Sequence, residues 1–146
     1  MTPRNRRERA FRRLLVREDG TGAGAPVIAA AVRLHGERFT QRLAPIIGEG
    51  GVTAICDRSL QLTESRFPGL AADRSSDQST APFARAQLSL EHQAPAVAAN
   101  AAVALFTTMS ELLISLIGEG LTTRLLREAW PDDFPSAGSP GDPPHD

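Results

Sequence analysis

The residues best suited to chemistry in this chain are two glutamates that stand between glycines in nearly the same context. Residues 46–50 read IIGEG and residues 116–120 read LIGEG, which places Glu49 and Glu119 in matching turns. Paired carboxylates can bind a cation or a basic partner, and they can carry out acid–base chemistry when burial separates their pKa values. A glutamate between two glycines is also an ordinary solvated turn residue, and we favour that simpler interpretation. The candidate turn residues are Gly48, Glu49, Gly50, Gly118, Glu119 and Gly120.

The other potential ligand residues do not predict a metal centre. No glutamate has a histidine three positions later, although that motif builds the di-metal sites of helical bundles. His35, His92 and His145 share no ligand spacing, and a single cysteine is too few for a structural zinc site. We therefore expect neither a metal nor a cofactor.

Nucleophilic catalysis by the single cysteine is also not favoured. Cys56 and His35 can be imagined as nucleophile and base, but the neighbouring Asp57 should raise the pKa of the thiol. We expect Cys56 to be a small core residue and His35 to lie at the edge of the core. The chain also lacks a GxSxG motif, a phosphate-binding loop and a dinucleotide fingerprint. No catalytic residue is predicted, and the protein is not expected to be an enzyme.

The strongest charge feature lies at the start of the sequence, where residues 1–17 contain seven arginines and one acid. This segment carries a charge of +6, and the remainder carries −7. Its guanidiniums can hold nucleic-acid phosphates, or it can lie on an anionic membrane with Phe11, Leu14 and Leu15 inserted. It can also fold back onto the acidic remainder or stay a solvated extension, which is the simplest interpretation. The candidate binding residues are Arg4, Arg6, Arg7, Arg9, Arg12, Arg13 and Arg17.

Helices must position these side chains, because apolar residues recur every three or four positions over most of the chain. The pattern predicts helices over about 26–47, 52–66, 95–117 and 121–130, and residues 1–19 can form another. Pro45 should kink the first of these helices or mark its last turn. Residues 71–87 are polar and predict a loose linker, followed by a turn over residues 88–93.

The doubled IGEG motif indicates an internal repeat. Each copy begins with Ala-Pro, at residues 25–26 and 94–95, continues as a long helix, turns through GEG and ends in a shorter helix. Two such hairpins related by a pseudo-twofold axis make an antiparallel four-helix bundle. The alternatives are a chance resemblance and a dimer in which each hairpin pairs across two chains. We predict an all-α fold: an antiparallel four-helix bundle built from two similar hairpins, with disordered N- and C-terminal tails.

The predicted organisation has three parts. Residues 1–24 are a basic head and hinge, 25–130 are the bundle domain, and 131–146 are an acidic, proline-rich tail that is expected to be disordered. Within the domain, hairpin 1 covers about 25–66, the linker about 67–90 and hairpin 2 about 91–130. A chain of 146 residues has room for one such domain and not for two.

Composition indicates the type of genome that encodes the protein and its expected location in the cell. All 16 basic residues are arginine, and alanine, glycine and proline are abundant, which is typical of a GC-rich bacterial genome. No secretory signal is visible, so a cytoplasmic location is expected. Residues 94–117 are long enough to span a membrane, but Asn100 and Glu111 interrupt them. We interpret this segment as the central helix of a bundle, and a membrane is not an expected partner.

These observations favour a non-enzymatic interaction or regulatory protein that binds a partner protein through a bundle face or the GEG turns. A homodimer is compatible with the same patterns. The alternative is a nucleic-acid binder whose affinity comes from the arginine-rich head. The first function predicts an apolar docking surface, and the second predicts binding that weakens steeply with salt.

Overall fold

The protein is all-helical in the part that its structure, a computed structural model, describes: residues 3–16, 24–68 and 82–134. These residues contain no strand, which confirms the all-α prediction. The helices run in the order α1 (Pro3–Leu15), α2 (Ala25–Glu64), α3 (Pro82–Glu91), α4 (Pro95–Ile117) and α5 (Glu119–Ala129). Arg17 and residues 135–146, which include His145, lie outside the described residues.

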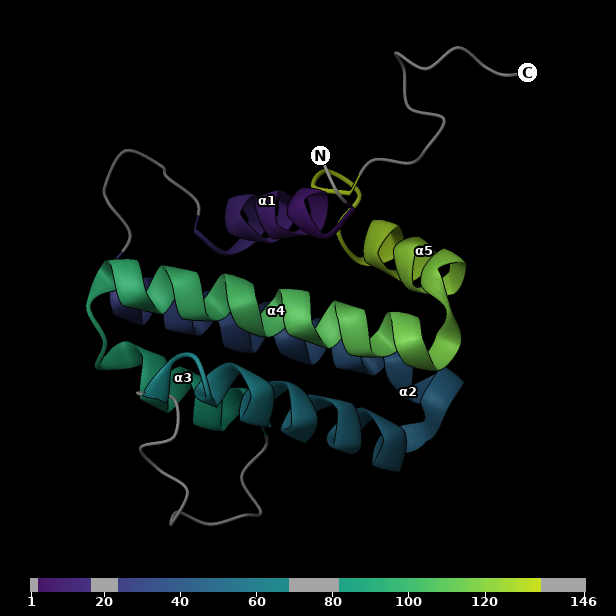
Figure 1. Cartoon of the computed structure of the whole chain (residues 1–146), viewed down its shortest axis with the longest axis horizontal. Helices are drawn as coiled ribbons and strands as arrows, with labels where there is room; N and C mark the ends of the chain where they lie inside the picture. The colour runs from purple at the N-terminus through teal and green to yellow at the C-terminus, as the bar shows by residue number, and fades with distance from the viewer. Residues whose placement is uncertain (1–2, 17–23, 69–81, 135–146) are drawn as a thin grey trace.

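The longest helix, α2, is bent sharply at Gly48. That residue has φ 80° and ψ 160°, which is not helical, and Figure 1 shows the chain turning back at this end of the molecule. The two segments that result correspond to the helices predicted before and after the first GEG motif. Pro45 lies in the last turn before the bend, which is one of the two outcomes expected for it.

Helix α4 occupies the centre of the fold. Its buried side chains include five alanines, which let neighbouring helices approach closely (Ala98, Ala99, Ala101, Ala102 and Ala104). It is also the one helix among the described residues that is long and apolar enough to cross a membrane, with a mean hydropathy of 1.6. Because 67% of that apolar window is buried inside the fold, α4 equally meets the description of a core helix.

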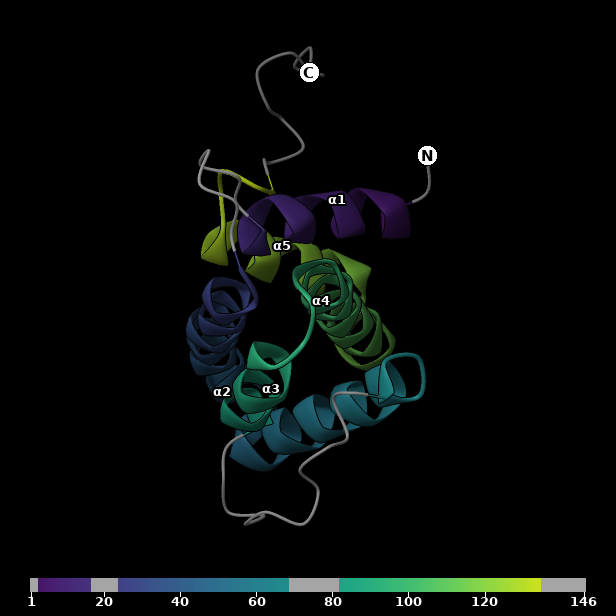
Figure 2. The ribbon, with the colours of Figure 1, turned by 90° about the vertical axis from the view of Figure 1, so that its left-hand side faces the viewer.

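The N-terminal head is not a disordered tail over residues 3–16, so that part of the prediction is wrong. Helix α1 forms and packs against α4, on the side away from the second half of α2 (Figures 1 and 2). The sequence correctly predicted a helix with Phe11, Leu14 and Leu15 on one side, and these side chains are buried in the core. Their burial removes apolar area from water, which explains why the segment docks in spite of its charge.

An aromatic cluster joins five parts of the chain: the helices α1 to α4 and the segment that follows α5. It consists of Phe11, Phe39, Phe83, Phe106, Trp130 and Phe134. Trp130 stacks on Phe39 with ring centres 5.2 Å apart, and Phe11 meets Phe106 and Phe134 edge-on at 5.5 and 5.2 Å. Edge-on and offset-stacked pairs are the favourable geometries for aromatic rings. The core therefore extends beyond the predicted domain limits at residues 25 and 130 at both ends.

The predicted linker, residues 67–90, contains most of a helix. In α3, Phe83, Ala86 and Leu90 recur at helical spacing and are buried, and they hold the helix against α2 and α4. The approach to α2 is close at Gly36, where an added Cβ atom would lie 2.4 Å from the Phe83 ring. Glycine is the residue that permits this packing, because every other residue places a carbon atom there. Residues 69–81 of the linker lie outside the described part.

Candidate interaction surfaces

The two GEG motifs begin with the same backbone conformation. Gly118 has φ 96° and ψ 155°, close to the values at Gly48, and these are the two residues with positive φ in the described part of the chain. The N–H of Gly118 donates to the carbonyl of Ile114, while its own carbonyl accepts from the N–H of Thr122. One residue thus ends α4 and begins α5. Such a conformation is essentially restricted to glycine, which explains the first glycine of each motif.

Both turns lie at the same end of the molecule, as Figure 1 shows from the bend of α2 and the junction of α4 with α5. We refer to residues 46–52 and 115–123 as the GEG end. Glu49 and Glu119 are exposed there, each within the first turn of the helical segment that follows. A negative charge in that position stabilises the helix by interacting with its macrodipole. This accounts for both glutamates without an acid–base role.

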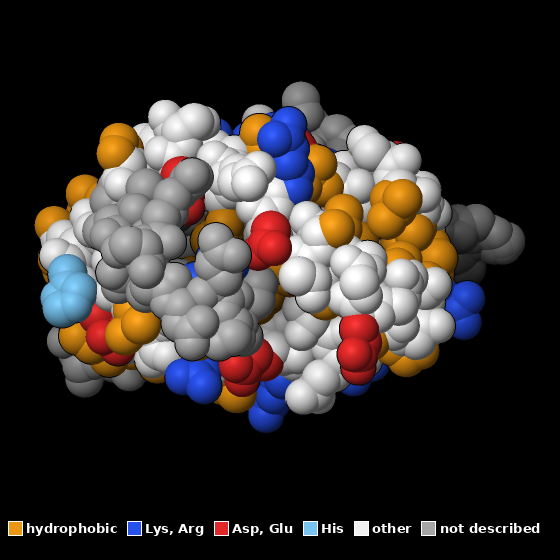
Figure 3. Space-filling model, turned by 90° about the horizontal axis from the view of Figure 1, so that it is seen from below, with side chains coloured by type: hydrophobic (Ala, Val, Ile, Leu, Met, Phe, Trp, Pro, Cys, Tyr) orange, Lys and Arg blue, Asp and Glu red, His pale blue; other side chains and the backbone are white. Residues whose placement is uncertain are grey.

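Exposed aliphatic side chains flank the two glutamates. Ile46 and Leu116, which precede the two motifs at equivalent positions, are 43% and 57% exposed, and Leu121 is 37% exposed. Figure 3 shows hydrophobic side chains on the lower face of the molecule at this end and also at the opposite end. The GEG end contains two glutamates and no arginine. It therefore combines exposed apolar and acidic side chains on two glycine turns.

Three arginines of α1 bond to other parts of the fold: Arg4, Arg12 and Arg13. Arg4 pairs with Glu8 at 3.6 Å and with Glu111 of α4. Arg12 donates from Nη2 to the side-chain oxygen of Asn100 at 3.1 Å.

Arg13 and Arg7 differ in how they meet the body. Arg13 donates to the main-chain carbonyl of Asp133 at 3.1 Å, with the carboxylate of Asp133 at 3.9 Å. Arg7 is half-buried, and its Nε has no hydrogen-bond partner in the structure. The folded-back arrangement considered from the sequence therefore holds for part of the head.

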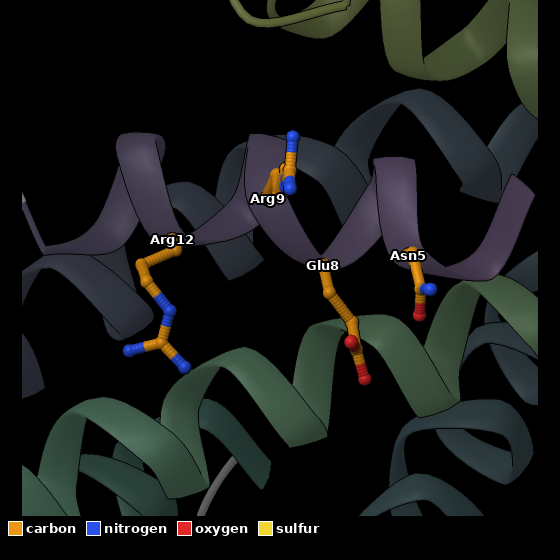
Figure 4. A pocket seen from close by; sticks show the side chains of 4 residues that line it. All are labelled: Asn5, Glu8, Arg9 and Arg12. Atoms are coloured by element: carbon orange, nitrogen blue, oxygen red, sulfur yellow. The ribbon is translucent and has the colours of Figure 1, made fainter. Parts of the chain in front are cut away.

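The outer side of α1 carries the remaining positive charge. Arg6 and Arg9 are exposed, and neither forms an ion pair or hydrogen bond with the residues that the structure describes. Together with Arg12 and Arg13, which are also exposed, they form what we call the arginine face. A hollow of about 380 Å³ lies along this helix, lined by Asn5, Glu8, Arg9 and Arg12 (Figure 4).

Cys56 and His35, the two residues considered for catalysis, have separate surroundings that the structure describes. Burial, and to a smaller extent the charge of Asp57, raise the pKa of the Cys56 thiol from 9.0 to about 12. A thiol with such a pKa stays protonated near neutral pH and is a poor nucleophile. His35 lies at the core edge as expected, where its Nδ1 accepts a hydrogen bond from Trp130. Among the described residues, no group of three His, Cys, Asp or Glu side chains is placed to hold a metal ion.

The sequence did not indicate the exposed aliphatic positions at the GEG end. Ile46 and Leu116 fit the apolar periodicity of their helices, so their exposure was not expected. The available signal was the repeat itself, since it puts an aliphatic residue two positions before the glycine in both copies.

Comparisons with models of protein families, with curated proteins and with solved structures find no match to this chain.

Proposed function

We propose that the protein is a non-enzymatic interaction protein that binds a partner protein through its GEG end. The observation that supports this proposal is the exposure of Ile46, Leu116 and Leu121 around two fixed glycine turns at one end of the fold. Single exposed aliphatic residues are common on protein surfaces, but a group of them at one site is a feature of docking surfaces. Hydrogen bonds on both sides of Gly118 hold its turn in the folded chain, which limits the ordering entropy that is lost when a partner binds.

We infer in addition that residues 25–64 and 95–129 are two copies of one hairpin, packed as an antiparallel four-helix bundle. Three similarities support this: the near-equal φ and ψ of Gly48 and Gly118, the proline in the first turn of α2 and of α4, and the common GEG sequence. A partner at the GEG end would then meet the same motif twice. The two aliphatic positions, Ile46 and Leu116, would be related by the repeat.

The experiment is site-specific photocross-linking in the cells that normally make the protein. A photoreactive residue replaces Leu116 in one variant and Leu34 in another, because Leu34 is similarly exposed, at 50%, and lies in the first half of α2. We expect a defined cross-linked protein from position 116 and none from position 34. The captured protein is then purified, and its affinity is measured for the intact chain and for variants.

The variants separate this surface from general hydrophobicity. Ile46→Ser with Leu116→Ser should weaken binding of the purified partner by tenfold or more, because buried aliphatic anchors dominate interface energies. The matched control is Val27→Ser with Leu34→Ser, since these residues are 60% and 50% exposed outside the GEG end. Equal losses in both pairs would contradict the proposal. A cross-link from position 116 to a second copy alone would assign this end to homodimerisation instead.

A further inference from the structure

We propose that the arginine face of α1 binds the phosphodiester backbone of a nucleic acid, as a site separate from the GEG end. The four arginines of this face are Arg6, Arg9, Arg12 and Arg13. The inference does not depend on the partner proposed above, because the two surfaces share no residue.

The burial of the opposite side of α1 fixes the direction in which these arginines project. Phe11 is fully buried, and Ala10, Leu14 and Leu15 are nearly so, which sets the rotation of the helix against α4. With a rise of about 1.5 Å per residue, Arg6 and Arg13 are separated by roughly 10 Å along the helix axis. The guanidiniums thus follow one ordered helix, with Arg12 at the edge of the array, where it contacts Asn100 of α4.

The described residues neutralise little of the positive charge on this face. Arg6 and Arg9 have no partner among the described residues, and Arg12 contacts the uncharged amide of Asn100. Among the residues that the structure describes, Arg13 is the member of this face that pairs with a carboxylate, that of Asp133 at 3.9 Å. Glu8, the acid in the hollow, is already paired with Arg4 at 3.6 Å, which reduces its repulsion of a bound phosphate. Guanidiniums hold phosphates through paired hydrogen bonds, so they suit this ligand chemically.

A nucleic acid fits this array better than a membrane surface or a small anion. An amphipathic helix on a membrane needs apolar side chains to insert, but those of α1 are buried in the core. Figure 4 shows that Arg9 and Arg12 extend in different directions from α1, so they do not close around one small anion. A duplex presents a phosphate charge about every 1.7 Å along its axis, which matches several separated guanidiniums.

The test is a titration of a dye-labelled 20-base-pair duplex, as DNA and as RNA, with the full-length protein over a range of salt concentrations. If four arginines contact phosphates, the slope of log K against log salt on DNA should be on the order of −3 to −4. Arg6→Gln with Arg9→Gln should reduce this slope by about two. These two residues are chosen because they do not hold α1 in place, and circular dichroism checks that the fold is kept.

The matched control is Arg38→Gln with Arg42→Gln on α2, which removes the same charge from two other exposed arginines. It should leave the slope unchanged within error. The proposal is overturned by no saturable binding at low salt, by equal effects of the two double variants, or by binding to vesicles containing an anionic phospholipid without binding to either duplex. Tighter binding to one duplex supports the proposal and identifies that nucleic acid as the ligand.

Discussion

Trp130 donates its indole N–H to Nδ1 of His35 at 3.2 Å, across 95 residues of sequence. The two rings also meet edge-on, with centres 5.9 Å apart. The ring of Trp130 stacks in addition on the ring of Phe39. The contact joins the residue that follows α5 to the middle of the first half of α2. It therefore gives His35 a structural role at the edge of the core.

Replacing His35 with leucine should destabilise the fold by roughly 1–3 kcal/mol, because the part-buried indole N–H of Trp130 loses its acceptor. His35→Gln keeps a hydrogen-bond acceptor at a similar distance and should cost less. Chemical denaturation followed by far-ultraviolet circular dichroism measures both free energies of unfolding. Equal costs for the two variants would show that ring packing, rather than the hydrogen bond, stabilises this contact.

The two glycines within each GEG motif should respond in opposite ways to alanine. Gly48→Ala and Gly118→Ala should each cost about 1–3 kcal/mol, because their positive φ with extended ψ is strained for any other residue. Gly50 and Gly120 lie in helical turns with open space around an added Cβ atom. Alanine there should stabilise by roughly 0.4–1 kcal/mol. Thermal unfolding of the four variants provides the comparison, and a loss at Gly120 as large as that at Gly118 would contradict it.

Gly36→Ala should destabilise the packing of α2 against α3. The new Cβ atom would lie 2.4 Å from the Phe83 ring, so the two helices must separate or the ring must move. Overpacking of this kind costs about 1–3 kcal/mol. In the background of Phe83→Leu the same substitution should cost less, since the smaller side chain leaves room. A double-mutant cycle measures this coupling, and an additive result would place the origin of the effect elsewhere.

Stability should fall between pH 9 and pH 12 because of Cys56. Its pKa is raised from 9.0 to about 12 by burial and then by Asp57, so the unfolded chain loses the thiol proton first. The stabilisation is complete below pH 9 and is lost as the pH rises through this interval. The chain has no lysine and no tyrosine, so no other type of side chain titrates there. Cys56→Ala should lower stability at neutral pH and remove the decline above pH 9 in denaturation measurements.

The central elements were predictable from sequence because long apolar periodicity determines them locally. The helix predicted over 95–117 forms as Pro95–Ile117, and the glycine breaks fall where the GEG motifs indicated. By contrast, α3 has a short buried stripe in a polar segment. Its formation depends on the space at Gly36, which is distant in sequence and invisible to periodicity.

The N-terminal head also has features that could not be predicted from local sequence. Its helix and its apolar side were predictable, but the surface that Phe11 contacts is assembled from Phe106, Trp130 and Phe134. Those residues come together only in the folded chain. For that reason the sequence could identify seven arginines as candidate binding residues, but it could not predict which of them bond within the fold. Arg4 pairs with Glu111, whereas Arg9 is exposed to solvent.

The aromatic cluster has a practical consequence, because the chain contains one tryptophan and no tyrosine. Near-ultraviolet emission from the native protein therefore originates at a single indole, placed where α1, α2, α4 and residues 130–134 meet. Detachment of α1 would expose that indole to water and shift its emission to longer wavelengths, while α4 could remain fully helical. The emission wavelength of Trp130 would therefore report whether α1 is packed against the rest of the fold.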